Sequence, residues 1–290
     1  MSMVINTNVA SLASQRHLAS SRAEMEQAME RLSSGKRINS AMDDAAGLTI
    51  AHSLDSKIAG LNQAVRNAND GIALVNLAEG AMDEISSMLT RMKELATQAI
   101  NGTYTNTDRN AIDAEYQALV EEITRVSDNT EFNGVAVIGA AANTTVKFQL
   151  GDTSSDTITV SLDNMDSVEL LLDSSLTVGT NDHAAAEATA GSDLTTATHA
   201  AETLVKIDNA IASVDSYRSN LGAVANRMEH AASNLMSRVE HQSAARSRIQ
   251  DADYAVESAN LAKAQVLQQA GTAMLSQANA STQNVLSLLK

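Results

Sequence analysis

Histidines and carboxylates are the residues of this chain whose chemistry could support catalysis or metal binding. The six histidines stand at positions 17, 52, 183, 199, 230 and 241, and none belongs to a His-Glu-x-x-His motif. In "HAAAE", His183 and Glu187 would lie one helical turn apart, which is a spacing that can hold a metal ion. The surrounding stretch is rich in alanine and acidic residues, so we interpret this pair as a chance occurrence.

Two carboxylates adjoin at Asp43 and Asp44. Paired carboxylates can perform acid-base chemistry, but this pair precedes a predicted helix, where negative charge is favourable. "SAMD" from Ser40 to Asp43 also resembles a capping box, so we interpret the pair as helix caps. The chain has no Gly-rich phosphate loop, no Gly-x-Ser-x-Gly elbow and no cysteine. We therefore expect neither an enzyme nor a metal or cofactor site.

The composition favours packed helices over an aromatic core. Hydrophobic residues make up 44% of the 290 residues, aromatic residues only 2%, and proline, which interrupts helices, is absent. The net charge of −15 argues against nucleic acid and anionic membrane surfaces as partners. No run of eighteen apolar residues occurs, so we expect no membrane span.

Alternating steps of four and three residues connect apolar positions over three long stretches, as in coiled coils. Three helices with such stripes can bury them against one another. The first stripe comprises Leu54, Ile58, Leu61, Val65, Ala68, Ile72, Val75, Ala78, Met82, Ile85, Leu89, Met92, Ala96 and Ala99. The second comprises Ile112, Tyr116, Leu119, Ile123 and Val126. The third comprises Leu204, Ile207, Ile211, Val214, Arg218, Leu221, Ala225, Met228, Ala232, Leu235 and Val239, and Arg218 is its one polar member.

The period changes to two between the second and third stripes. Residues 145–151 and 156–162 alternate apolar with polar around "DTSS", which predicts a β-hairpin. Asn133-Gly134 is a further turn signal, and residues 177–198 have no clear period and are expected to be irregular. Residues 141–200 carry nine acidic side chains and one basic side chain, so we expect this segment to face solvent.

The two ends of the chain carry weaker stripes of the same spacing. No charged residue occurs between Ala264 and Leu289, and the N-terminus has no basic residue before Arg16 and no continuous apolar run. The N-terminus is therefore not a conventional cleavable signal. Pairing of the two ends would leave an exposed apolar face, which usually marks an interaction surface. The stripes are Ile5, Val9, Leu12, Arg16 and Ala19, and Leu267, Gly271, Met274, Ala278, Ser281, Val285 and Leu288.

Long blocks at both ends resemble bacterial flagellin. These blocks are "VINTNVASLASQRHL", "RLSSGKRINSAMDDAAGLTIA", "NDGIALVNLAEGAMDEI", "EFNGV" and "ARSRIQDADYAVESANLAKAQVLQQAGTAMLSQAN…QNVLSLLK". The middle of the chain is too short for the outer domains that many flagellins carry. "QANASTQNVL" also lacks a proline that the family would lead us to expect near Ser281 or Thr282.

The resemblance and the heptads together predict a mainly α fold. We expect an elongated antiparallel coiled-coil and helical-bundle rod with a small β-hairpin region and with the N- and C-termini paired. Residues 1–40 and 250–290 would form an inner terminal coiled-coil domain, and residues 41–140 and 195–249 a helical rod domain. Residues 141–194 would form a short, acidic, surface-exposed hairpin and loop region.

The resemblance implies a structural subunit that self-polymerises into the flagellar filament used for swimming, through coupled folding of its terminal helices. It implies export through the flagellar type III route, without a cleavable signal peptide, to the extracellular filament. The implied partners are other copies of the chain, the export apparatus, a flagellin chaperone, the filament cap and the hook-junction proteins. A hook–filament junction protein of related sequence is the alternative, and the short middle argues against an enzyme displayed on a filament.

Particular residues follow from the resemblance. "LTRMKELATQ" is similar to the segment that the host Toll-like receptor for flagellin binds, which implies Arg91, Leu95 and Glu115 as recognition residues of the monomer. Ser and Thr of residues 153–198 are candidates for O-glycosylation with no choice among them, and an unmodified loop is the alternative. The expected inner polymerisation contacts are Ile5, Val9, Leu12, Leu267, Met274, Val285 and Leu288. The expected connector and inter-subunit residues are Lys36, Arg37, Asn39, Asp43 and Asp44.

Overall fold

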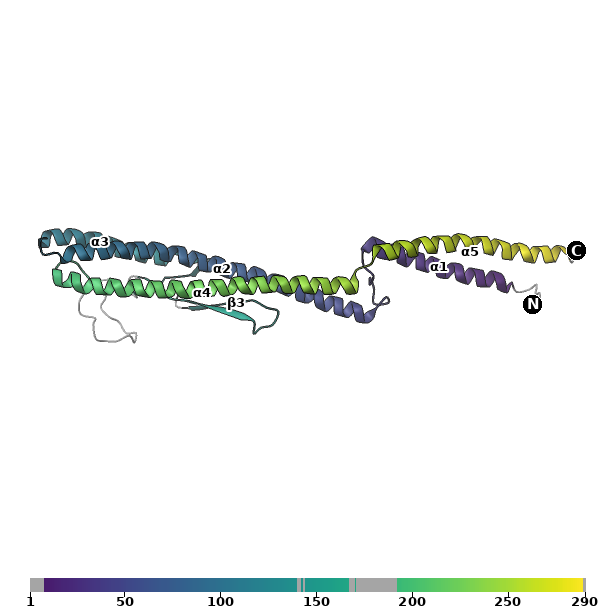
Figure 1. The fold of residues 1–290 in the computed structure, drawn as a ribbon, viewed down its shortest axis with the longest axis horizontal. Helices are drawn as coiled ribbons and strands as arrows, with labels where there is room; N and C mark the ends of the chain where they lie inside the picture. Colours follow the sequence, from purple (N-terminus) through teal and green to yellow (C-terminus); the bar gives the residue numbers. More distant parts are fainter. Residues whose placement is uncertain (1–7, 140–141, 143, 167–169, 171–191, 289–290) are drawn as a thin grey trace. The chain divides into compact units, whose positions relative to one another are not determined.

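The computed structural model describes residues 8–139, 142, 144–166, 170 and 192–288, and of residues 281–288 it describes the backbone alone. Five helices dominate this part of the chain, so the predicted mainly α fold is confirmed (Figure 1). The helices are α1 (Val9–Ser34), α2 (Ala45–Ile100), α3 (Asn106–Asn129), α4 (Ala197–Gln250) and α5 (Tyr254–Leu288). The strands are β1 (Glu131–Phe132), β2 (Val135–Ala136), β3 (Thr144–Gln149) and β4 (Thr157–Leu162).

The chain divides into two compact units. The first unit contains Met1–Ala59 and Val239–Lys290, and the second contains Gly60–Arg238. These limits differ from the predicted boundaries after residues 40 and 249, because the first turns of α2 and the last turns of α4 belong to the first unit. Arg246 on α4 donates to Asp55 on α2 over 2.5 Å, which ties these two segments together.

The core of the second unit lies between α2, α3 and α4. Every member of the three predicted stripes in this unit is buried or half-buried, so the heptads located the packing faces correctly. Helices of 56 and 54 residues would be about 80 Å long, and such lengths are possible because no proline interrupts them. The most fully buried large side chains of this core include Met82, Ile85, Leu89, Met92, Tyr116 and Ile123.

Helix α3 begins and ends at recognisable local signals. Thr105 caps it by accepting a hydrogen bond from the backbone N–H of Asp108, and the Asp108 carboxylate accepts from the backbone N–H of Thr105. After the helix, Asn133 (φ 51°) and Gly134 (φ 77°) form the tight turn between β1 and β2. The predicted Asn-Gly turn is therefore confirmed.

The second hairpin has the predicted position, with β3 antiparallel to β4 and Val146 opposite Val160. Its exposure differs from the prediction, because Val160 and Leu162 are almost completely buried in the core of the second unit. Strand side chains alternate between two faces, so one face of the hairpin packs on the bundle while only the other meets solvent. Within the predicted loop, Leu194 is buried too, and its backbone N–H donates to Asp113 of α3.

Candidate assembly surface

The first unit pairs α1 with α5 in antiparallel orientation (Figure 1), as predicted for the ends of the chain. Both helices turn toward each other a stripe with four-three spacing, and half of the fourteen members of the two stripes are small. Such side chains let two backbones approach closely but bury little apolar area. The inward stripes are Ser11, Ser14, Leu18, Ser21, Met25, Ala28 and Leu32, and Glu257, Leu261, Ala264, Gln268, Gly271, Leu275 and Ala278.

Two contacts show how closely the helices approach. A Cβ atom placed on Gly271 would lie 3.2 Å from Leu18 Cδ1 and 3.9 Å from Leu18 Cβ, so Leu18 lies directly over this glycine. At the other end of the pair, the Asn8 side-chain amide donates to the carbonyl of Ala278 over 3.1 Å. The same Asn8 side chain accepts from the backbone N–H of Ser11 and so caps α1.

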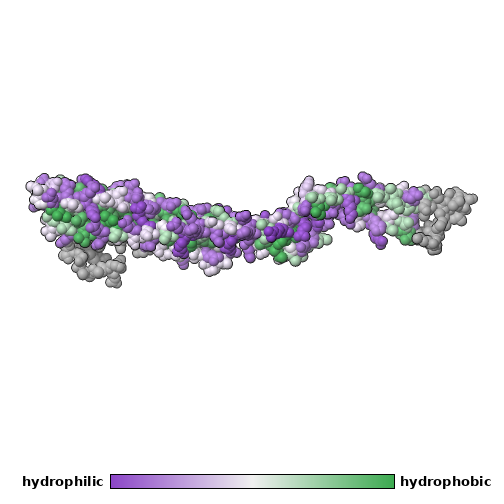
Figure 2. Space-filling view, in the orientation of Figure 1, coloured by the Kyte–Doolittle hydropathy of each residue, from purple (hydrophilic) through white to green (hydrophobic). Residues whose placement is uncertain are grey.

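Several large apolar side chains of the pair point outward. Their exposed fractions are 68% for Val9, 56% for Leu12, 64% for Val266, 42% for Leu267 and 61% for Met274. We call these five residues the outer apolar face, and Figure 2 shows apolar residues on the visible surface of the paired helices. No neighbour within the described part of the chain covers them.

The predicted terminal stripes were therefore wrong about which face closes the pair. Only Gly271 and Ala278 of the predicted members point inward, whereas Val9, Leu12, Arg16, Ala19, Leu267 and Met274 are exposed. On these helices, two adjacent faces both carry residues at four-three spacing, so the spacing alone does not say which face is buried. Close approach of the two backbones favours the face that carries more small residues. Of the expected polymerisation contacts, Ile5 lies outside the described residues, as do the side chains of Val285 and Leu288.

The connector, residues 35–44, turns the chain from α1 into α2. Gly35 ends α1 in the left-handed region (φ 69°), and its carbonyl accepts from the backbone N–H of Ala252. Arg37 donates its backbone N–H to the carbonyl of Gln250 and its guanidinium to the carbonyl of Ile249, each over 2.6 Å. Lys36 pairs with Asp251 through an isolated β-bridge, so the connector is held against the junction of α4 and α5.

Asp43 organises the turn inside the connector. Its carboxylate accepts from the backbone N–H groups of Ser40 and Asn39 and from the side chain of Gln27, with distances of 3.0 to 3.2 Å. These hydrogen bonds hold the pKa of Asp43 below its usual value, and the bond from the Ser40 backbone contributes most. Asp44, rather than a capping box at Ser40–Asp43, caps α2 by accepting from the backbone N–H of Gly47 over 2.9 Å.

The predicted receptor residues do not share one surface. Arg91 on α2 is half exposed and donates to Glu115 on α3 over 2.8 Å and to Glu94 over 2.9 Å. These partners raise the pKa of Arg91, and the hydrogen bond to Glu94 contributes more than the one to Glu115. Leu95, in contrast, is only 2% exposed and belongs to the core, because its position on α2 faces the other helices.

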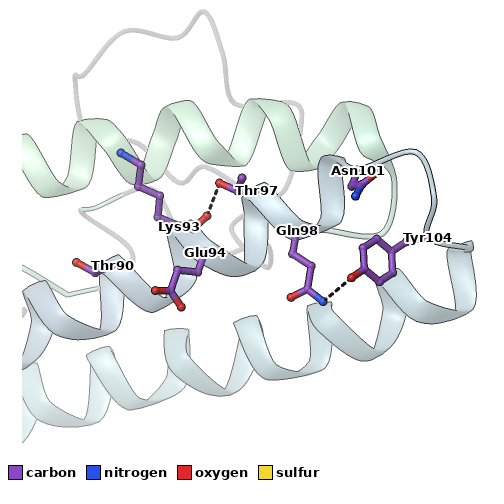
Figure 3. A pocket seen from close by; sticks show the side chains of 7 residues that line it. All are labelled: Thr90, Lys93, Glu94, Thr97, Gln98, Asn101 and Tyr104. Atoms are coloured by element: carbon purple, nitrogen blue, oxygen red, sulfur yellow. Dashed lines mark hydrogen bonds between the residues drawn. The ribbon is translucent and has the colours of Figure 1, made fainter.

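An open polar groove lies beside this ion pair (Figure 3). It is lined by side chains that include Lys93, Glu94, Gln98 and Tyr104, and the Gln98 amide donates to the Tyr104 hydroxyl over 3.2 Å. Lys93 also pairs with Asp208 on α4 over 2.6 Å.

Across the described residues, no cluster of three or more His, Cys, Asp or Glu side chains could hold a metal ion. None of the described helices is long and apolar enough to cross a membrane.

The hydroxyls proposed as glycosylation sites fall into two groups. Exposed hydroxyls occur on the described hairpin and just before and at the start of α4, whereas Ser192 is buried. The exposed residues are Thr153, Ser154, Ser155, Thr157, Thr159, Ser161, Thr196 and Thr198. The hydroxyl-bearing residues between 171 and 191 lie outside the described residues, as do His183 and Glu187.

The net charge is divided unequally between the two units. The first unit contains ten basic and ten acidic side chains and is therefore neutral, so the whole net charge of −15 belongs to the second unit. Copies of the first unit can pack together without net repulsion, whereas copies of the second unit repel one another. The charge distribution therefore favours the first unit as the place where chains meet.

Paired terminal helices with an exposed apolar face, in a mainly helical chain, are typical of a structural protein. Comparisons with known proteins agree. Models of the bacterial flagellin N-terminal and C-terminal helical regions match residues 5–142 and 204–289. A flagellin of Halalkalibacterium halodurans is 41% identical over 288 residues, covering 99% of this chain and 100% of the relative. A flagellin of Xenorhabdus nematophila is 42% identical over 314 residues, covering 100% of both chains.

The chain belongs to the bacterial flagellin family. The crystal structure of Bacillus cereus flagellin is also similar, with a TM-score of 0.49 and 29% identity over 59% of this chain and 88% of that one. As a flagellin, the protein is a subunit of the flagellar filament and lies outside the cell. It is a structural protein and not an enzyme.

Proposed function

We propose that this flagellin polymerises with itself by burying the outer apolar face of the α1–α5 pair against neighbouring copies. The observation that carries the proposal is the exposure of Val9, Leu12, Val266, Leu267 and Met274 on a neutral unit. Taking such a side chain from full exposure to full burial contributes about 1.5–3 kcal/mol. Contacts between copies that do not close into a ring generate an open helical polymer.

Assembly and folding of the terminal helices would be coupled. Isolated helices are marginal in water, and half of the inward side chains of this pair are small, so the pair buries a modest area within one chain. The larger side chains become buried only when other copies arrive. We therefore infer that the terminal pair gains most of its stability on polymerisation, in the manner of segments that fold on binding.

The experiment that tests this proposal replaces outer side chains by glutamine, which keeps the helix but removes the apolar contact. Leu12→Gln with Met274→Gln should abolish pelletable polymer and filaments in electron micrographs. Met236→Gln is the matched control, because Met236 is 54% exposed on α4 in the second unit. Deletion of residues 279–290 should also prevent filament formation. Normal filaments from both the double variant and the deletion would refute the mechanism.

The remaining partners are proposals that rest on the family. We infer export through the flagellar type III route with a flagellin chaperone, followed by addition at the filament tip beneath the cap and beyond the hook-junction proteins. The connector residues Lys36, Arg37, Asn39, Asp43 and Asp44 would contact adjacent subunits, and the fully exposed Met42 between them supports this. A hook–filament junction protein is less well supported, since the family models and both relatives are flagellins.

A second candidate function is recognition of the monomer by a Toll-like receptor. One observation favours it: Arg91 and Glu115 come from different helices yet form a single exposed ion pair beside the polar groove. Such a pair presents both charges to a partner. Because Leu95 is buried, it would support the position of Arg91 from beneath and would not contact the receptor.

A further inference from the structure

The interface between α1 and α5 contains one ion pair that is largely shielded from solvent. Arg31 Nη1 donates to Glu257 Oε1 over 3.0 Å, and the exposed fractions of the two side chains are 23% and 8%. Asn260 donates to the second oxygen of Glu257 over 3.3 Å, and Asp43 of the connector lies 3.9 Å from Arg31 Nη2. Arg31 Nε is buried without a hydrogen-bond partner among the described residues.

This pair stands out because the stripes around it discriminate less sharply between registers, although the Asn8–Ala278 contact and the backbone hydrogen bonds of the connector also favour the observed one. Seven residues apart, the inward stripes place Ser14, Ser21 and Ala28 on α1 and Ala264, Gly271 and Ala278 on α5, so a slide of one heptad replaces these small residues by other small residues. Exposed pairs such as Arg22 with Glu26, whose side chains are 70% and 61% exposed, lie along one helix and are unaffected by sliding. The Arg31–Glu257 pair, in contrast, exists in one register only.

We propose that Arg31 and Glu257 set the register of the terminal helix pair, with Asp43 coupling that register to the connector. A slide of one heptad in one direction would place Glu257 beside Glu24, which precedes Arg31 by one heptad on the same helix. A slide in the other direction would place Arg31 beside Ala264 and Glu257 beyond the end of α1. Each displaced register separates two partly buried charges, which is strongly unfavourable.

Each charge also interacts favourably with the dipole of its own helix. This contribution to helix stability does not depend on pairing, so the pair itself acts on register more than on helix formation. Arg31 lies in the last turn of α1 and Glu257 in the first turn of α5, where their signs are favourable toward the helix dipoles. Sliding does not change these positions. A shielded pair with one unpaired donor also adds little net stability, and specificity is the better-attested role of such pairs. Arg31 and Glu257 are therefore positioning residues.

The inference goes beyond the proposed polymerisation, because it concerns pairing within one chain. The register nevertheless decides how Val9 and Leu12 on α1 align with Val266, Leu267 and Met274 on α5. A displaced register would divide the outer apolar face into two patches offset by about 10 Å, which is one heptad of helix.

Disulfide cross-linking of the full chain can measure the register directly, since the chain has no cysteine of its own. Leu18→Cys with Gly271→Cys reports the observed register, because the two Cβ positions are 3.9 Å apart, within the range of disulfides. Leu18→Cys with Ala264→Cys, or with Ala278→Cys, reports a slide of one heptad in either direction. We expect the 18–271 bond to dominate in the otherwise unchanged chain, before and after polymerisation is induced.

In the Arg31→Glu background, the ratio of 18–271 to displaced cross-links should fall by about tenfold or more, as breaking a buried pair predicts. Arg31→Glu with Glu257→Arg should restore the 18–271 bond, whereas Arg22→Glu, the matched surface control, should leave the ratio unchanged. An unchanged ratio in Arg31→Glu would overturn the proposal. If Arg31→Glu loses all cross-links, the swap decides: recovery of the 18–271 bond supports the register role, and no recovery overturns it. Because the ratio is measured on monomer as well, failure of polymerisation is distinguished from failure of register.

Discussion

Arg218 on α4 donates both Nε and Nη2 to one oxygen of Glu79 on α2, over 3.0 and 2.7 Å, and its Nη2 lies 3.2 Å from Asp83. Arg218 is the polar member of an otherwise apolar heptad stripe. Its stem packs at the edge of the core while its guanidinium reaches two carboxylates one helical turn apart on α2. An ion pair therefore links α4 to α2 at the one position of the apolar stripe that carries a polar residue.

Arg218→Met keeps an apolar stem and removes the cation, so Glu79 and Asp83 then repel each other across one helical turn. We expect a loss of about 0.5–1 kcal/mol in the free energy of unfolding, measured by urea titration at low salt. The loss should shrink at about 0.5 M NaCl, where charges are screened. Arg66→Met is the control, since Arg66 donates to the neutral Gln63. A salt-independent loss would show that packing dominates.

Gly139 follows β2 and lies against the backbone of α3. A Cβ atom at this position would lie 2.8 Å from the Ser127 carbonyl oxygen, and Ser127 is fully buried with its hydroxyl donating to Ile138. Gly139→Ala should therefore lower the free energy of unfolding by about 1–3 kcal/mol. Gly80→Ala should raise it by about 1 kcal/mol, because Gly80 is helical and no described atom lies within 4 Å of its added Cβ. Equal melting temperatures for the two variants would contradict this account.

Asp43 should make the connector sensitive to acid. Its pKa in the folded protein lies below the ordinary value of 3.8, so the unfolded chain binds a proton more readily than the folded one. The stabilisation is therefore fully present above about pH 4 and is lost as the pH falls through the folded pKa. Asp43→Asn should melt a few degrees lower than the parent protein at pH 7, and the difference should shrink progressively as the pH falls below about 4. A difference that does not shrink with falling pH would assign the effect to geometry instead of charge.

Polymerisation should depend on salt because the charge of −15 resides in the second unit while the proposed contacts form through the neutral first unit. The screening length falls from about 30 Å at 0.01 M salt to about 10 Å at 0.1 M. We expect the critical concentration for pelletable polymer to fall over this range. Glu121→Gln with Asp128→Asn, which removes two charges from α3, should weaken the salt dependence. Polymerisation that weakens with added salt would indicate attractive charge contacts between copies.

Arg91→Asp should abolish receptor signalling by the monomer, because it places a third carboxylate beside Glu94 and Glu115. The measurement is reporter-cell activation by monomer whose helix content is verified by circular dichroism. Arg125→Asp is the matched control, since Arg125 is an exposed arginine on α3 with a single carboxylate partner, Glu122. Equal activation by Arg91→Asp and the parent protein would remove Arg91 from the recognition surface.

The stripes of the second unit were predictable because each carries many large apolar residues over several heptads. Met82, Leu89 and Tyr116 have one favourable place, the common core, and most neighbouring positions on the helices are polar. The hairpin and the Asn-Gly turn were predictable for a similar reason, since alternation and backbone conformation are local properties. The packing of one hairpin face on the bundle was missed, because alternation does not say whether a covering partner exists.

The pairing of the terminal helices could be predicted from the sequence, but the faces and the register of the pair could not. The four-three spacing of the ends, their missing charges and their resemblance to flagellin determined that they would pair and belong to a filament subunit. Only the tertiary structure decided that Leu18 lies over Gly271 and that Leu12 and Met274 point outward. It also decided that Arg31 meets Glu257 and that Leu95 is buried. The physical reason is that periodicity identifies stripes, whereas the choice between adjacent faces and registers depends on how closely two backbones can approach in space.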